Sequence, residues 1–267
     1  MPLARRALAE ALGTGLLVAA VVGSGVMAAR LSPGNVGVQL LANSLATAFA
    51  LAVLILVFGP VSGAHFNPVV SLADWWLGRR LTARELGVYV LAQLAGGALG
   101  CVLANLMFDL RPVTFSSTER GGGPLWLGEV VATGGLVLLV FALARTNRAA
   151  VAPAAVGAYI GAAYWFTSST SFANPAVTVA RMLTDSFAGI APGSVPGFVG
   201  AQLVGLVVGV AALAALYPDA RAAVDAGVPA APGPAGPVPV AHLPAAPVPA
   251  GPVPAAPVAA GGTGNDG

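Results

Sequence analysis

The sequence predicts an all-α membrane protein with six transmembrane helices and two re-entrant half-helices, arranged as an inverted repeat of three plus three helices. The first observation is composition: 57% of the residues are hydrophobic and 8% are charged. A soluble domain carries about 25% charged residues, so this chain lacks the charge to cover a water-facing surface. The second observation is the length of its uncharged runs, and the third is a pair of Asn-Pro dipeptides set in apolar sequence.

Six runs are long enough to cross a bilayer, which needs about 20 mostly apolar residues. The fourth run reaches this length only if Glu129 is accepted inside it. An even number of spans puts both termini on one side, and that side would hold eight of the 12 arginines. Because positive residues favour the cytoplasm, we expect both termini there. The expected helices cover residues 7–29, 38–58, 83–106, 125–145, 150–167 and 197–217.

Two further stretches, Gly59–Trp76 and Ser168–Leu183, are too apolar for ordinary loops and too short to span. Each contains an Asn-Pro pair followed by helix-compatible sequence. Irregular backbone at membrane depth is tolerated only where it is buried in protein or lines a wet cavity. Each stretch therefore predicts a re-entrant half-helix that begins at its motif. The two motifs are Asn67-Pro68-Val69 and Asn174-Pro175-Ala176.

Residues 218–267 differ from the rest of the chain, since they hold 12 of the 22 prolines. Proline this dense excludes helix and sheet, so we expect a disordered or polyproline-II-like cytoplasmic tail rich in Pro and Ala, outside a membrane domain of residues 1–217. The tail is either a docking segment for a proline-binding partner or a low-complexity extension without one, and its composition favours the second.

The two halves of the membrane domain repeat each other, about 1–108 and about 120–217. Because each repeat holds three spanning helices, an odd number, the copies must have opposite topology, as in membrane transport proteins. Three pairs of segments correspond in the same order: Ala9–Thr14 with Gly128–Thr133, His65–Val70 with Phe172–Val177, and Ala92–Gly96 with Ala201–Gly205.

With these motifs, residues 1–217 resemble the aquaporin, or major intrinsic protein, family. The resemblance implies a channel for small neutral solutes in the lipid bilayer of the plasma membrane, assembled as a homotetramer. The segment Ser169–Arg181 is similar to that of bacterial aquaporins associated with arsenic resistance. All 12 basic residues are Arg, which favours a bacterial origin.

The family resemblance assigns the pore-lining groups. Asn67 and Asn174 would turn amide N–H groups toward the solute, and the positive ends of the two half-helices would repel cations. His65 is either a proton relay or, as the resemblance implies, part of the cytoplasmic half of the pore. Backbone carbonyls would come from Gly63, Ala64, His65 and Phe66 before the first motif, and from Ser171, Phe172 and Ala173 before the second.

Glu10 and Glu129 are the carboxylates set into predicted spans, where acidic groups are costly and usually functional. One interpretation is proton coupling. The other, which the resemblance and the symmetric placement favour, is that each carboxylate accepts hydrogen bonds from the backbone of a re-entrant loop.

The selectivity filter departs from the pattern of water-selective relatives, because Val177 stands where they carry Arg. Counting as the family does, Thr47 lies 20 residues before Asn67, and Ala162 and Ser171 lie 12 and three before Asn174. A filter of Thr47, Ala162, Ser171 and Val177 would be small and uncharged, and would suit larger neutral solutes. Arg181, one turn beyond Val177, would pair with Asp185 on the surface or, less favoured, reach the outer vestibule.

The leading hypothesis is a passive channel for water, glycerol-like polyols and, as a further candidate, arsenite or related arsenicals. The alternative is a proton-coupled secondary transporter that uses Glu10 or Glu129, and a third is a non-conducting scaffold that acts through the tail. The sequence holds no nucleotide motif, metal cluster or nucleophile constellation, so we expect no enzyme activity, no metal, no cofactor and no nucleic-acid partner. The single cysteine, Cys101, lies in an apolar run and is expected to serve packing.

Overall fold

The computed structural model describes residues 1–78 and 80–218, and within these ranges the chain is helical with no strand. Several helices begin or end at or next to a glycine or proline. Most of the helix ends fall within a few residues of the expected positions. The elements are α1 (Leu3–Leu31), α2 (Val36–Ser62), α3 (Pro68–Trp76), α4 (Ala83–Met107), α5 (Gly123–Arg145), η1 (Ala149–Val151), α6 (Ala152–Phe166), α7 (Pro175–Arg181), η2 (Pro192–Ser194) and α8 (Val195–Leu216).

In the described part of the chain, six helices are long and apolar enough to cross a membrane: α1, α2, α4, α5, α6 with η1, and α8 with η2. The predicted fold class is confirmed. Two helix ends differ most from expectation, each by four residues: α1 begins at Leu3 and not at residue 7, and α2 was expected to end at residue 58. The helix continues through Pro60, where one backbone hydrogen bond is lost, and ends at Ser62. Gly63 closes it in a left-handed conformation (φ 93°), and its N–H donates to the Gly59 carbonyl at 3.0 Å.

The two halves of the chain are built on the same helix pairing, since α1 packs mainly on α4 and α5 mainly on α8. Glycines set the spacing of both pairs. A Cβ added to Gly96 or Gly100 of α4 would lie 2.0 Å from a backbone oxygen of α1. A Cβ on Gly205 or Gly209 of α8 would lie 2.8 or 2.6 Å from a backbone oxygen of α5. Side chains at these positions would force the helices apart, so the small residues permit the close contact.

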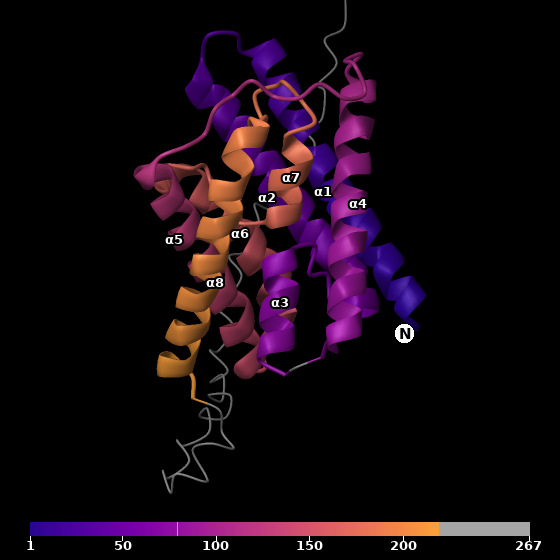
Figure 1. Ribbon diagram of the computed structural model, residues 1–267, viewed down its shortest axis with the longest axis vertical. Helices are drawn as coiled ribbons and strands as arrows, with labels where there is room; N and C mark the ends of the chain where they lie inside the picture. Colours follow the sequence, from indigo (N-terminus) through magenta and orange to yellow (C-terminus); the bar gives the residue numbers. More distant parts are fainter. Residues whose placement is uncertain (79, 219–267) are drawn as a thin grey trace, which may run out of the picture.

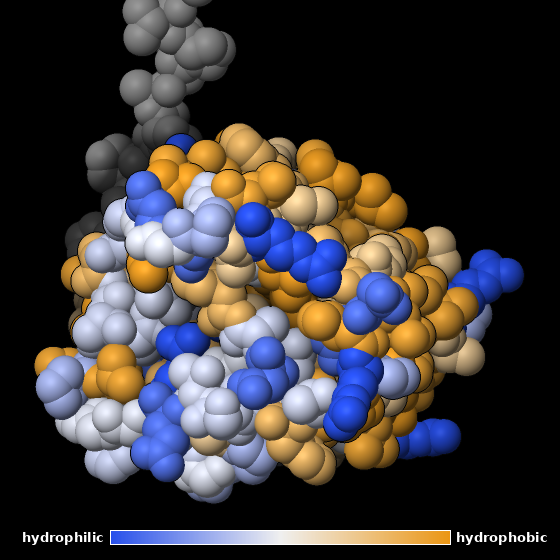
Figure 2. Space-filling view, turned by 90° about the horizontal axis from the view of Figure 1, so that it is seen from above, coloured by the Kyte–Doolittle hydropathy of each residue, from blue (hydrophilic) through white to orange (hydrophobic). Residues whose placement is uncertain are grey.

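The half-helices α3 and α7 lie in the middle of the bundle, α7 in its upper half and α3 in its lower half (Figure 1). The N-terminus and the end of α8 lie toward the lower end, opposite the loops that follow α4 and α7. Figure 2 looks onto the upper end, where hydrophilic residues cover much of the face and hydrophobic residues gather along one edge. The expected tail, apart from Pro218, and two of the counted arginines, Arg79 and Arg221, fall outside the described residues.

Candidate functional site

The two Asn-Pro motifs meet near the middle of the molecule and are joined by their asparagine side chains. Nδ2 of Asn67 donates to the carbonyl oxygen of Ala173 at 2.7 Å, and Nδ2 of Asn174 donates to that of Phe66 at 2.8 Å. Each asparagine therefore reaches across to the loop of the other repeat. One N–H of each amide is used in this way, and the second donates to no atom of the described residues.

The same asparagines cap the half-helices that they precede. Oδ1 of Asn67 accepts from the N–H of Val69 at 2.9 Å, and Oδ1 of Asn174 accepts from those of Ala176 and Val177 at 3.0 and 3.3 Å. Proline follows in the first turn of each helix, where its missing N–H costs nothing. The amide orientation is thus fixed at both ends, oxygen toward its own helix and nitrogen toward the other repeat.

Glu129 of α5 anchors the loop before α7. It is fully buried, and its carboxylate accepts from the N–H groups of Phe172 and Ala173 at 2.9 and 2.8 Å. A third donor is Nε2 of Gln202 in α8, at 2.6 Å. Hydrogen bonds to a charged acceptor are about twice as strong as neutral ones, so this carboxylate is a strong hold on the loop.

Glu10 of α1 has the mirrored arrangement in the first repeat. It is fully buried and accepts from the hydroxyl of Ser62 at 2.6 Å and from the N–H groups of His65 and Phe66 at 3.0 and 2.7 Å. Nε2 of Gln93 in α4 donates to it at 2.8 Å. Neither Glu10 nor its counterpart lines the cavity described below.

Both loops hold residues in the left-handed region, which side chains other than Gly rarely adopt. Ala64 and Phe66 have φ of 51° and 50°, and Thr170, Ser171 and Ala173 have φ of 61°, 52° and 49°. Such strain persists only where the surroundings fix the backbone. The buried carboxylates supply that restraint, because they take the N–H groups that these turned backbones expose.

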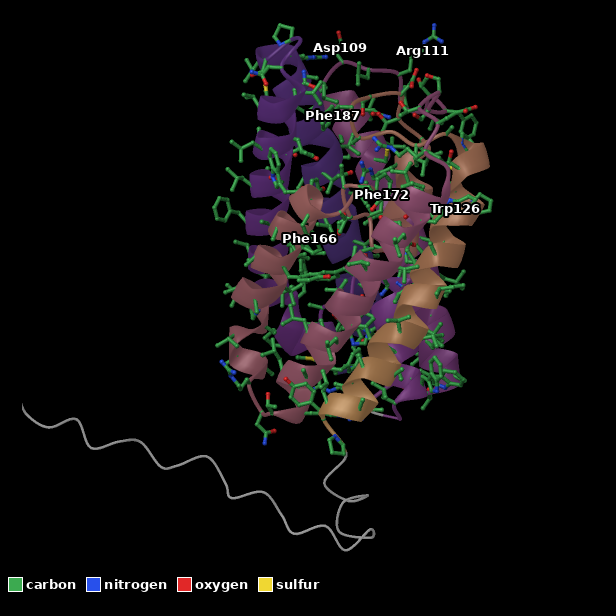
Figure 3. All side chains as sticks on the ribbon, turned by 90° about the vertical axis from the view of Figure 1, so that its left-hand side faces the viewer. Asp109, Arg111, Trp126, Phe166, Phe172 and Phe187 are labelled. Atoms are coloured by element: carbon green, nitrogen blue, oxygen red, sulfur yellow. The ribbon has the colours of Figure 1, made fainter. Side chains whose placement is uncertain are left out.

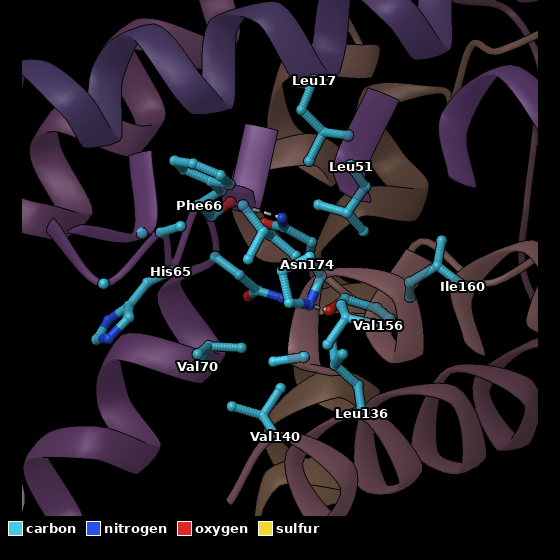
Figure 4. Close-up of a pocket in the computed structure, with 18 of the residues that line it drawn as sticks. Leu17, Leu51, His65, Phe66, Val70, Leu136, Val140, Val156, Ile160 and Asn174 are labelled. Carbon is cyan, nitrogen blue, oxygen red and sulfur yellow. Dashed lines mark hydrogen bonds between the residues drawn. The ribbon is translucent and has the colours of Figure 1, made fainter. Parts of the chain in front are cut away.

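A cavity of about 470 Å³ runs past the two asparagines, from Arg80 and Ala149 at the lower end to Arg181 at the upper end. Figure 4 shows Asn174 at its centre, with Val156 and Ile160 of α6 to one side and His65 to the other. Most of its wall is apolar, so hydrogen bonds from the side chains of the wall can come from only a few polar groups. Those groups are Thr47, His65, Asn67, Asp74, Arg80, Tyr164, Ser171, Asn174 and Arg181.

Of the four expected filter positions, three line the cavity: Thr47, Ser171 and Val177 are 3%, 3% and 5% exposed and belong to its wall. The placement of Ala162 is wrong. This residue is exposed on the outside of α6 and does not line the cavity.

The side of α6 that faces the cavity carries Val156, Ile160 and Tyr164, which recur every four residues. The hydroxyl of Tyr164 lies 3.2 Å from that of Thr47. Tyr164 was missed because counting back from the motif assumed a loop of standard length. The four-residue spacing of bulky side chains along α6 was the signal that could have found it.

The expected pairing of Arg181 with Asp185 is also wrong. Arg181 is 3% exposed, and its Nε donates to the carbonyl oxygen of Ala188 at 2.5 Å. Asp185 instead accepts from the backbone N–H and the hydroxyl of Ser117 at 3.0 and 3.1 Å, which lowers the pKa of its carboxyl. The helix ends at Arg181 and the chain turns, so the i+4 relation on which the pairing rested does not exist.

His65 lines the lower half of the cavity, together with Gly63, Ala64 and Phe66. Its Nδ1 lies 3.1 Å from the hydroxyl of Ser71, which also accepts from Gln93. The upper loop contributes Ser171, Phe172 and Ala173 to the wall. The other motif residues do not line the cavity and lie in the half-helices behind its wall: Pro68, Val69, Pro175 and Ala176. The free cysteine, Cys101, is buried in the hydrophobic core.

Comparison with known proteins agrees with this geometry. The family model described as Major intrinsic protein matches residues 1–172. The chain is 54% identical to Aquaglyceroporin AqpS of Rhizobium meliloti (strain 1021), over 82% of this chain and 93% of that protein. It is 31% identical to Probable aquaporin AqpM of Archaeoglobus fulgidus, over 81% and 97%.

The X-ray structure of the aquaglyceroporin from Plasmodium falciparum has the same fold. Its TM-score is 0.62 at 22% identity, over 80% of this chain and 97% of that one. With two half-helices joined through their asparagines, six spanning helices and these relatives, the chain belongs to the major intrinsic protein family, whose aquaglyceroporin members are channels and not enzymes.

Proposed function

We propose that this protein is a passive channel for small uncharged solutes: water, glycerol-like polyols, and arsenite or related arsenicals. The observation that carries the proposal is the cavity between Arg80 and Arg181, which passes both asparagines and has a mostly apolar wall. A solute that loses water on entry can bond the free amide N–H of Asn67 and then that of Asn174. The substrate class also draws support from the relative named as an aquaglyceroporin.

The filter supports solutes larger than water. Three of the side chains that line the cavity are small, namely those of Thr47, Ser171 and Val177. The position directly after the second motif holds Val177, so it carries no guanidinium. Arsenite in its neutral form carries hydroxyl groups, as glycerol does, and so presents the same hydrogen-bonding chemistry to this wall.

Proton coupling through Glu10 or Glu129 is not favoured. A coupling carboxylate must face the solute path, whereas the carboxylates of both residues accept from loop backbones and do not line the cavity. A change in their protonation would release the loops instead of moving a proton along the path.

The proposal includes placement and assembly. Residues 1–217 form the channel domain, both termini face the cytoplasm of a bacterial cell, and residues 218–267 serve no conduction step. The described arginines support this orientation, since Arg5, Arg6, Arg80, Arg84, Arg145 and Arg148 belong to the end that carries the N-terminus. A homotetramer would cover part of the large apolar surface of the outer helices, and native mass spectrometry of the purified protein would test it.

Stopped-flow measurements on reconstituted vesicles test the function. Water, glycerol and arsenite are offered separately to vesicles with and without the protein. We expect initial solute fluxes that rise linearly with the gradient and that an imposed pH gradient does not alter. Accumulation of glycerol or arsenite above its outside concentration, driven by a proton gradient, would refute the passive channel.

A further inference from the structure

Arg181 is buried and lines the cavity, so an ion pair on the surface does not explain its position. It ends α7, is 3% exposed and lines the upper end of the cavity. Within the described residues it forms no ion pair. Its Nε donates to the carbonyl oxygen of Ala188, whereas its two terminal nitrogens donate to no atom in the described ranges. A guanidinium has five N–H donors, so four remain for a solute.

Phe172 sets the plane of this guanidinium. Cζ of Arg181 lies 3.5 Å from the centroid of the Phe172 ring, a short cation–π contact. Figure 3 shows Phe172 in the upper half of the molecule, nearer its middle than Phe187. Cζ of Arg120 lies 5.3 Å from the same ring, and its Nε donates to the carbonyl oxygen of Gly189 at 2.9 Å. Arg120 lies in the loop between α4 and α5, and its burial there lowers the pKa of its guanidinium.

A second, independent observation is an unpartnered hydroxyl in the wall of the same cavity. Oγ of Ser171 is buried and has no hydrogen-bond partner among the described residues, although the residue lines the cavity. Leaving a buried hydroxyl unpaired costs about 1–3 kcal/mol, a cost that a bound solute or water removes. Tyr164 and Thr47 add a pair of hydroxyls to the same wall.

We propose that Arg181, one helical turn beyond the second Asn-Pro-Ala, is the charged solute contact at the upper end of the cavity and acts there with Ser171 and Tyr164. This proposal rests on the proposed function and adds a residue that determines which solutes the channel accepts. The guanidinium donates to the oxygens of hydroxyl-bearing neutral solutes, and its permanent charge repels cations and protons in a narrow path. The room beside Val177 and the charge at Arg181 are thus two separate features, one setting width and the other polarity.

The test is Arg181→Gln in the full-length channel, with Arg181→Lys beside it. Arg30→Gln is the matched control. Arg30 also lies at the upper end, stacks on a phenylalanine (5.3 Å to Phe108) and donates to a backbone carbonyl, but it is exposed and does not line the cavity. Proton conductance under an imposed potential and glycerol permeability are measured per inserted channel.

Arg181→Gln should raise proton conductance by about tenfold or more, since a charge in a cleft shifts local ion concentrations by 10–10³-fold. Arg181→Lys keeps the charge but lacks the Nε–H bond to Ala188, and should keep proton exclusion, as should the Arg30 control. Equal leakage from both Arg181 variants would show that the residue only holds the loop, and would overturn the proposal. Unchanged proton conductance in a folded Arg181→Gln channel would also overturn it.

A second measurement serves if Arg181→Gln does not fold. Ser171→Cys places one reactive thiol in the wall of the cavity, and the native Cys101 is fully buried. A small anionic methanethiosulfonate should react faster than a cationic one, by about tenfold relative to their ratio on a free thiol, and glycerol should slow the reaction. Equal relative rates or no reaction would overturn the proposal. Failure of the parent channel to pass glycerol would instead refute the proposed function.

Discussion

Replacing Glu129 with glutamine removes one charge from the anchor of the upper loop and leaves its shape unchanged. The carboxylate accepts from the N–H of Phe172 on one oxygen, and from the N–H of Ala173 and Nε2 of Gln202 on the other. An amide has one oxygen and one NH₂ group. Whichever way it turns, the NH₂ group faces at least one backbone N–H that previously had an acceptor.

The cost follows from these contacts. One buried backbone N–H left without an acceptor costs about 1–3 kcal/mol. The bonds that remain change from charge-assisted to neutral and weaken by about half. Gln202 can reduce the loss by rotating, because its Oε1 has no partner in the described structure, but it cannot supply an acceptor to the backbone. We expect Glu129→Gln to lower the free energy of unfolding by about 2–4 kcal/mol.

Thermal unfolding in a mild detergent measures this change, and solute flux in vesicles is measured on the same preparations. Glu119→Gln is the control, since Glu119 is exposed and lies in the loop before α5. The expected result is a clear loss of stability in Glu129→Gln that accompanies any loss of flux, with no change in the control. A parent flux that responds to pH, together with a Glu129→Gln variant of intact stability whose flux does not, would refute the anchoring role and favour proton coupling.

Three further predictions concern width, tail and packing. The double change Val177→Arg with Thr47→Phe should sharply reduce glycerol and arsenite flux and spare water, non-additively, because both side chains enter one constriction; parent-like glycerol and arsenite flux in the folded double variant would contradict the filter assignment. Deletion of residues 219–267 should leave yield and flux per channel unchanged, and a loss of flux would assign the tail a gating or assembly role. Gly96→Ala places a Cβ 2.0 Å from a backbone oxygen of α1, whereas Gly87→Ala on the same helix meets nothing within 4 Å; only the first should lower detergent stability and yield, and equal effects would contradict the close helix contact.

Much of the fold could be predicted because membranes restrict the choices. Uncharged runs marked the spans, and the repeated Asn-Pro motifs marked the half-helices. The positions of Glu10 and Glu129 in equivalent places of the two repeats pointed to equivalent roles. These signals are local or symmetric, so a single sequence contains them in full.

The errors at Ala162 and Arg181 have a common cause. Both predictions depend on counting along the chain from the second motif, across segments that are not regular helix. Ala162 is separated from Asn174 by a loop with left-handed residues, and Asp185 follows a helix that ends at Arg181. Counting preserves facing only within a helix, whereas loops turn side chains by amounts that the sequence alone does not state.

Because the hydrogen bonds of the two asparagines cross between the repeats, each repeat holds the loop of the other in place. Asn67 holds the carbonyl of Ala173, and Asn174 holds that of Phe66. A substitution at either asparagine therefore disturbs the loop of the opposite repeat as well as its own cap. The two copies cannot diverge independently at this point, and the centre of the path cannot open or close by drawing the half-helices apart unless both bonds break together. Movement that separates the two half-helices therefore costs both of these hydrogen bonds, whereas movement at the two mouths of the cavity leaves them intact.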